Sequence, residues 1–168
     1  MNYRPFINLA LALWTLWAAA TALAQDNVRI GVLSNVDRQY MTEQRTMLQD
    51  LAASRLGRHF NGDRNNDLAL LQALLDKRLV RSEQTRELQA MGVIMGDLLA
   101  TDLDMHWVIY EDRLGRSRAL RYQQSDNYLF PMTMISRRRE ADNHTPVADI
   151  YHKAREIIAS RQPAMPFQ

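Results

Sequence analysis

The spacing of the apolar residues changes at Met105, and this change limits the folds open to the 168-residue chain. Before it, Leu88, Met91, Met95 and Leu98 recur every three or four residues, which is the spacing of an amphipathic helix. After it, "MHWVIYE" takes up the two-residue period of a strand, and the turn "DRLG" and a second strand, "RSRALRY", follow. A helix that leads directly into a β-hairpin predicts an α+β domain.

The hairpin and the segment after it predict a small antiparallel meander of three strands. Asp112 opens the hairpin turn and Gly115 closes it. Residues 123–127 form a second polar turn, and "YLFPMTMIS" is expected to be the third strand. Pro131 has no amide hydrogen, so this strand cannot occupy a central position in the ladder. The next residues, "RRREADNH", are then a solvated connection.

Three helices are expected before the meander and one after it. The first spans residues 37–56 and ends at Gly57, and the third ends near Leu103. Each helix has a polar or acidic residue where an N-cap belongs. These residues are Asp37 for the first helix, Asn66 or Asp67 for the second, Ser82 and Glu83 for the third, and Thr145 followed by Pro146 for the last.

The N-terminus has the order of a secretory signal peptide. Arg4 precedes an apolar run over residues 9–20, and the small-residue tripeptide "ALA" ends at Ala24. The apolar run is too short to cross about 30 Å of hydrocarbon at 1.5 Å per residue. The sequence therefore predicts export, cleavage after Ala24, and a periplasmic protein with no stable membrane insertion.

Four segments follow from these features. Residues 1–24 are the signal peptide, and residues 25–36 are an N-terminal arm or edge strand because Val28, Ile30 and Val32 alternate. Residues 37–160 form a single α+β domain, and residues 161–168 are a flexible tail. Removing 24 of 168 residues leaves 144, which suffices for one hydrophobic core.

Composition argues against several classes of site. The chain has no cysteine, so it has no disulfide, thiolate ligand or lipid-anchoring thiol. Without Arg4, 20 basic residues face 19 acidic ones, and this near-neutral balance predicts no nucleic-acid partner. No glycine-rich phosphate loop occurs, and the histidines lack metal-ligand spacing, so we expect neither cofactor nor metal. The histidines are His59, His106, His144 and His152.

Several phrases together resemble a bacterial family, the domain of unknown function 3806. They are "LQALLD", "ELQAMGVIMG", Trp107, "EDRLGRSRALRY" and "FPMTMISRRRE", and their order extends over roughly residues 41–151. One departure is Arg137, which stands where a lysine is expected and so keeps the charge but changes the geometry. The resemblance implies a compact α+β domain and assigns no catalytic residue.

Gly92, Gly96 and Trp107 have two interpretations. The glycines lie one helical turn apart, and each costs about 1 kcal/mol relative to alanine in a helix. We expect that cost to reflect close approach of the third helix to the sheet near Trp107. The alternative is a cleft in which a small ligand contacts the glycine backbone and the indole ring.

The carboxylates at the hairpin turn suggest an enzyme as the alternative function. Glu111 and Asp112, with His106, could serve a cell-envelope hydrolase. Adjacent strand residues point to opposite faces, however, and Asp112 suits the turn itself. A hydrolase is therefore the less favoured interpretation.

The arginines are the strongest candidates for a binding surface. Two groups converge if the meander pairs as expected, and they could bind a carboxylate, a phosphate or an acidic protein surface. We therefore expect a periplasmic binding or interaction module, of inhibitor or immunity type or for a small anionic ligand, whose partner is an envelope protein or that ligand. The candidate binding arginines are Arg116, Arg118, Arg121, Arg137 and Arg138.

Overall fold

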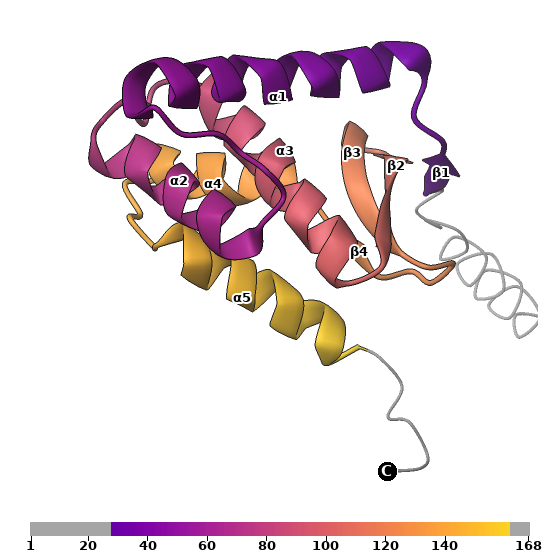
Figure 1. Cartoon of the computed structure of the whole chain (residues 1–168). Helices are drawn as coiled ribbons and strands as arrows, with labels where there is room; N and C mark the ends of the chain where they lie inside the picture. Colours follow the sequence, from indigo (N-terminus) through magenta and orange to yellow (C-terminus); the bar gives the residue numbers. More distant parts are fainter. Residues whose placement is uncertain (1–27, 162–168) are drawn as a thin grey trace, which may run out of the picture.

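The computed structural model describes residues 28–161. The predicted signal peptide, its cleavage site and residues 162–168 of the predicted tail lie outside this range. The described part folds into five helices beside a four-stranded sheet (Figure 1). In chain order the elements are β1 (Arg29–Gly31), α1 (Asn35–Leu56), α2 (Arg64–Asp76), α3 (Thr85–Asp102), β2 (Met105–Asp112), β3 (Gly115–Tyr122), β4 (Tyr128–Leu129), α4 (Pro131–Glu140) and α5 (Val147–Ala159).

The sheet is antiparallel with the order β1-β2-β3-β4. β2 and β3 pair along their whole length, from Met105 opposite Tyr122 to Asp112 opposite Gly115. β1 adds a short edge strand beside the hairpin-turn half of β2. β4 pairs only with Leu120 and Arg121 on β3, so the other half of β3 has no strand on that side.

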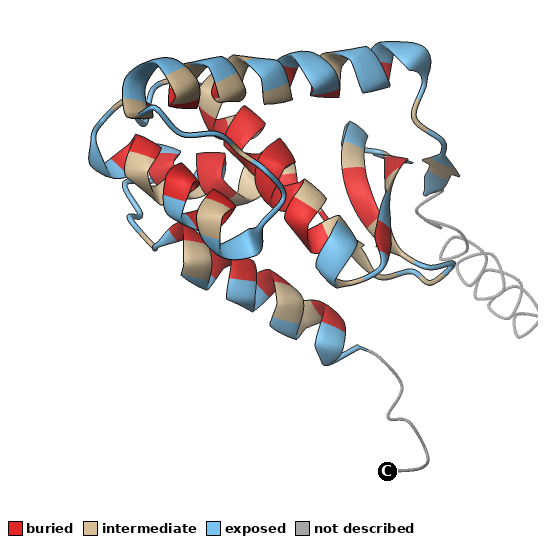
Figure 2. Ribbon diagram, in the orientation of Figure 1, coloured by how far each residue is buried: buried red, intermediate tan, exposed pale blue. Residues whose placement is uncertain are grey.

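α3 is the central helix of the fold. It packs against α1, α2, α4, α5 and β2, and ten of its residues are buried, the two glycines included. In Figure 2 the middle of α3 is mostly buried and its exposed residues lie at its ends, whereas α1 presents one exposed side along its length. The apolar stripe of Leu88, Met91 and Met95 that predicted this helix lies in the core.

Four helix starts differ from the prediction. α1 begins two residues earlier, at Asn35, because Ser34 is its N-cap. The Ser34 hydroxyl accepts a hydrogen bond from the Asp37 amide at 3.2 Å, and the Asp37 carboxylate accepts one from the Ser34 amide at 3.0 Å. Asp37 is thus the third residue of a capping box, not the N-cap. The N-caps of α2, α3 and α5 are Asp63, Gln84 and Pro146, one to four residues from the predicted ones.

Both predicted helix ends are confirmed. Gly57 follows α1 in the left-handed conformation, with φ of 61°, and its amide closes the last turn. Leu103 is the C-cap of α3, where its amide donates to Leu99.

The third predicted strand is mostly wrong. Only Tyr128 and Leu129 form a strand, and α4 begins at Pro131 and includes "RRRE", which was expected to be a solvated connection. Proline has no amide hydrogen for a ladder but fits the first position of a helix, where that hydrogen would have no partner. Pro131, Ile135 and Arg139 are buried at four-residue intervals, which is a helical and not an alternating pattern.

The α+β class and the antiparallel arrangement are therefore confirmed, whereas the counts change. The described residues hold five helices instead of four and four strands instead of three. Within residues 28–161, no helix has the length and hydropathy needed to cross a bilayer.

Candidate functional site

A cavity of about 560 Å³ lies against β3 and the beginning of α4. β4 ends at Leu129, and the chain enters α4 at Pro131. The half of β3 next to the hairpin turn therefore has no strand neighbour on the β4 side. The cavity borders this half of β3. Its lining includes three arginines and two aromatic residues, which are Arg116, Arg118, Arg137, Tyr110 and Phe130.

The aromatic residues form an apolar wall. The rings of Tyr110 and Phe130 meet edge to face with centroids 5.2 Å apart. Tyr110 also packs edge-on against Tyr128 at 5.0 Å. This chain of contacts holds the two wall residues in fixed positions and supplies flat apolar surface beside the arginines.

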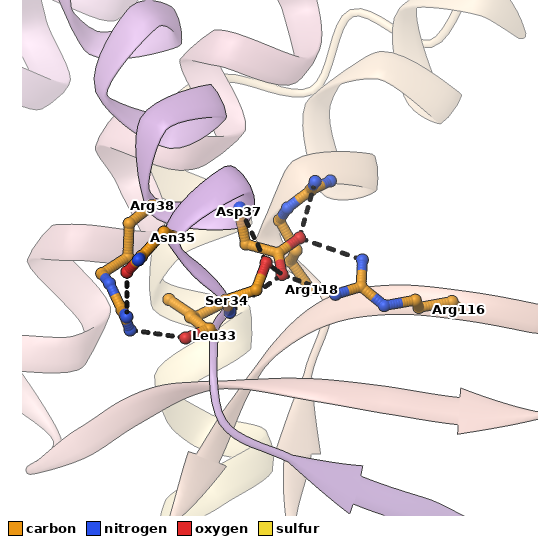
Figure 3. Close-up of polar contacts among 7 residues, drawn as sticks. All are labelled: Leu33, Ser34, Asn35, Asp37, Arg38, Arg116 and Arg118. Atoms are coloured by element: carbon orange, nitrogen blue, oxygen red, sulfur yellow. Dashed lines mark hydrogen bonds and ion pairs between the residues drawn. The ribbon is translucent and has the colours of Figure 1, made fainter.

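Asp37 holds two of the arginines together (Figure 3). Its carboxylate receives two bonds from Arg116, Nη1 to Oδ1 at 2.9 Å and Nη2 to Oδ2 at 2.5 Å, and Arg118 Nη2 lies 2.9 Å from Oδ1. The Asp37 side chain is only 2% exposed. Hydrogen bonds from Arg116, and then from Ser34, hold the pKa of Asp37 well below its ordinary value against the opposing effect of burial.

The arginines keep part of their hydrogen-bonding capacity. Arg118 stacks over the Tyr40 ring at 4.3 Å, and its buried Nε has no hydrogen-bond partner in the described structure. The Arg137 guanidinium has neither an ion pair nor a hydrogen bond to any residue between 28 and 161. Three arginines against Asp37 and the lining residue Asp112 leave a formal charge of +1 around the cavity.

The other two predicted arginines lie elsewhere. Arg121 closes the second turn, where its Nε donates to the Ser125 carbonyl and its Nη2 to the Gln124 carbonyl, both at 2.8 Å. Arg138 folds back on α4 and donates to the Met134 carbonyl at 2.6 Å. Neither lines the cavity.

Gly92 and Gly96 are packing positions and do not line this cavity. A Cβ on Gly92 would lie 2.4 Å from the Pro131 carbonyl oxygen, so the contact is with α4 and not with the sheet. A Cβ on Gly96 would lie 2.4 Å from Cζ2 of Trp107, which matches the predicted approach. Trp107 is half-buried and donates from Nε1 to Asp97 at 3.0 Å.

The structure does not bring His106 beside Glu111 and Asp112, the two carboxylates of the hydrolase hypothesis. Asp112 lines the cavity, but its Oδ1 accepts the amides of Leu114 at 2.8 Å and Gly115 at 3.2 Å, as expected for a turn residue. His106 lies opposite Arg121, at the end of β2 away from the turn. Asp112 is six residue steps further along β2, which is about 20 Å.

Some residues of the site were not predicted. Asp37 carried a capping signal, but its partners follow 79 and 81 residues later and no local pattern marks them. The segment "FPMTMIS" is part of the family resemblance, yet no local pattern identifies Phe130 as a residue of the cavity wall. In the range that the structure describes, no group of three or more histidines and carboxylates is placed to hold a metal ion.

The fold has a counterpart among solved structures. A protein from Bacteroides thetaiotaomicron VPI-5482, with a crystal structure at 1.50 Å resolution, superposes with a TM-score of 0.70 at 18% identity. The match covers 77% of this chain and 47% of that one, so the chain spans about half the length of this neighbour. At this identity the likeness establishes the fold alone. No curated protein matches the chain.

The family model that matches begins later than the sequence resemblance suggested. It extends over residues 67–151, from the first turn of α2 to Tyr151 in α5, and leaves α1 outside. The match includes the glycine pair, Trp107, the hairpin and the Phe-Pro segment. The chain therefore belongs to the family described as domain of unknown function DUF3806.

Proposed function

We propose that this protein is an exported, periplasmic binding module that holds a small organic anion in the cavity between β3 and α4. The convergence of Arg116, Arg118 and Arg137 beside Tyr110 and Phe130 carries the proposal. A carboxylate or phosphate group would take the arginine side, and an aromatic or aliphatic body would lie on the ring side.

Charge supports an anion more than a neutral ligand. Asp37 pairs with Arg116 and Arg118 and orients both guanidinium groups. It makes no contact with Arg137, whose positive charge it leaves unpaired. Arg137 is exposed and has no partner in the described structure, so it can contact a ligand without first breaking an ion pair. Guanidinium groups bind carboxylate and phosphate through paired hydrogen bonds.

The test is calorimetric titration of the mature chain with benzoate and phenyl phosphate, and with benzyl alcohol as the neutral analogue. We expect saturable binding of at least one anion and none of the alcohol. Arg137→Gln removes a charged hydrogen-bond donor and should weaken binding about tenfold or more. Arg138→Gln is the matched control, because this neighbouring arginine contacts its own helix and not the cavity.

Equal binding by the two variants would exclude Arg137 as a ligand contact. Binding of benzyl alcohol as tight as that of benzoate would show that the arginines do not select the ligand.

Export is tested separately, by N-terminal sequencing of the protein recovered from a periplasmic fraction. We expect Gln25 as the first residue, and recovery of the intact leader in the cytoplasm would refute the proposed location.

A further inference from the structure

The three consecutive arginines of α4 enter three different environments. Successive helix residues are rotated by about 100°, so neighbours cannot share a face. Arg137 lines the first cavity and Arg138 contacts its own helix, whereas Arg139 points into the fold and is only 9% exposed. A charged side chain buried to this extent ordinarily has a partner of opposite charge.

Arg139 has no carboxylate partner within residues 28–161. Its Nη1 contacts His144 Nδ1 at 2.5 Å, and His144 Nε2 lies 2.9 Å from Asp142 Oδ1. A guanidinium can only donate, so Nδ1 accepts and Nε2 carries the imidazole hydrogen toward Asp142. His144 therefore positions the guanidinium through Nδ1, and the Asp142 carboxylate reaches Arg139 only through this imidazole.

The same guanidinium borders a second cavity of about 480 Å³. This cavity lies between the loop that joins α2 to α3 and the end of α4, and it shares no lining residue with the first cavity. Besides Arg139 and His144, its charged lining consists of Arg78, Arg81, Asp76 and Glu83. Among the residues that line the cavity, three arginines against two acids leave a formal charge of +1, and Asp142 contacts His144 from outside the lining.

Both acids already have partners. Arg81 Nε lies 2.5 Å from Glu83 Oε1, and the Gln72 amide donates to Asp76 Oδ1 at 2.7 Å. Arg78 is exposed, and its guanidinium has no hydrogen bond or ion pair in the part of the chain that the structure covers. Arg78 and Arg139 are thus the two cations of this cavity that are available to a ligand.

We propose that this second cavity is a binding site for phosphate, free or as a monoester, with Arg139 at its base and Arg78 at its mouth. A tetrahedral oxyanion offers several acceptor oxygens and can take paired bonds from both guanidinium groups. It would supply a negative charge in direct contact with Arg139, which no carboxylate within residues 28–161 does. The site does not depend on the organic-anion cavity, because the two have different residues.

The test is titration of the mature chain with inorganic phosphate and with glycerol phosphate at constant ionic strength. Calorimetry gives the affinity, and the imidazole resonances of His144, assigned with His144→Asn, report binding beside Arg139. We expect saturable binding and a matching shift of the His144 resonances. Tighter binding of inorganic phosphate would identify the free ion as the ligand, and tighter binding of glycerol phosphate would identify a monoester.

Arg78→Gln should weaken phosphate binding by about tenfold or more, because it removes a charged donor from an exposed position. Lys77→Gln is the matched control, since this neighbouring cation does not line the cavity, and it should bind as the unaltered chain does. Arg137→Gln should also leave the His144 response unchanged. Arg139→Gln should abolish binding if it folds; if it does not, the comparison of Arg78→Gln with Lys77→Gln decides. Absence of saturable binding, or equal affinities in those two variants, would overturn the proposal.

Discussion

Replacing Asp37 by asparagine should weaken the fold while strengthening anion binding. The substitution keeps the size of the side chain and removes the charge that lies between Arg116 and Arg118. The free energy of unfolding should fall because a buried ion-pair network loses its centre. Affinity for benzoate should rise, because Asp37 no longer repels an anion in the neighbouring cavity.

The size of the stability loss follows from the exposure of the partners. Breaking a fully buried ion pair costs about 3–5 kcal/mol. The Asp37 side chain is 2% exposed, but Arg116 is 45% and Arg118 21% exposed, so water can solvate the released guanidinium groups. We therefore expect a loss of about 3 kcal/mol, at the lower end of that range. For a domain of this size the melting temperature should fall by about 10 °C.

The assay is urea unfolding followed by circular dichroism, with Asp50→Asn as the control. Asp50 is an exposed residue of the same helix and should change the free energy of unfolding by less than about 0.5 kcal/mol. The dependence on pH gives a second check. The pKa of Asp37 is lowered in the folded state, so its contribution is complete above the unfolded value of about 3.9 and is lost as the pH falls below it.

The stability difference between the original chain and Asp37→Asn should therefore be constant from neutral pH down to about pH 5 and shrink at more acidic pH. The interpretation would be refuted if Asp37→Asn were no less stable than Asp50→Asn. A difference that stayed constant to pH 2 would show that the lost stability does not come from the ionised carboxylate.

Two substitutions test the packing around α3 by urea unfolding. Gly92→Ala should destabilise the chain by about 2 kcal/mol despite the better helix propensity of alanine, because the new Cβ would lie 2.4 Å from a backbone oxygen of Pro131. Gly31→Ala, with its nearest contact at 3.8 Å, is the control, and equal stability of the two variants would contradict the close approach. Trp107→Phe should cost about 2 kcal/mol, since it removes the bond to Asp97 and part of the packing over Gly96. A cost below 0.5 kcal/mol in circular dichroism melts would argue that the indole contributes little.

Local signals were sufficient where neighbouring residues decide the structure. The hairpin was predictable because alternation and turn chemistry agree, and Asp112 accepts the turn amides as its position suggested. The end of α1 was predictable for the same reason, since Gly57 can adopt the left-handed conformation that terminates a helix. The core stripe of α3 needed only its spacing.

Segments with two acceptable structures were not predictable in this way. "YLFPMTMIS" contains apolar residues at both strand and helix intervals, and packing of α4 against α3 decides between them. Gly92 allows this packing, because it has no side chain where the Pro131 backbone lies. The sequence alone does not identify Pro131 as the residue that Gly92 contacts. The first cavity exists because β4 ends at Leu129 instead of continuing along β3. The longer strand predicted for this segment would have filled the position of the cavity, so the sequence did not predict the site.

The pairing of Asp37 with Arg116 and Arg118 also bears on the extent of the folding unit. The family match begins at residue 67, yet α1 lies before it and packs on α3. Its buried carboxylate neutralises one of two adjacent charges on β3, and Tyr40 covers Arg118. Deleting α1 would expose both guanidinium groups and the apolar face of α3, so residues 67–151 should not reproduce the cavity without α1. The helix outside the family match therefore supplies the carboxylate that positions two arginines of the candidate site.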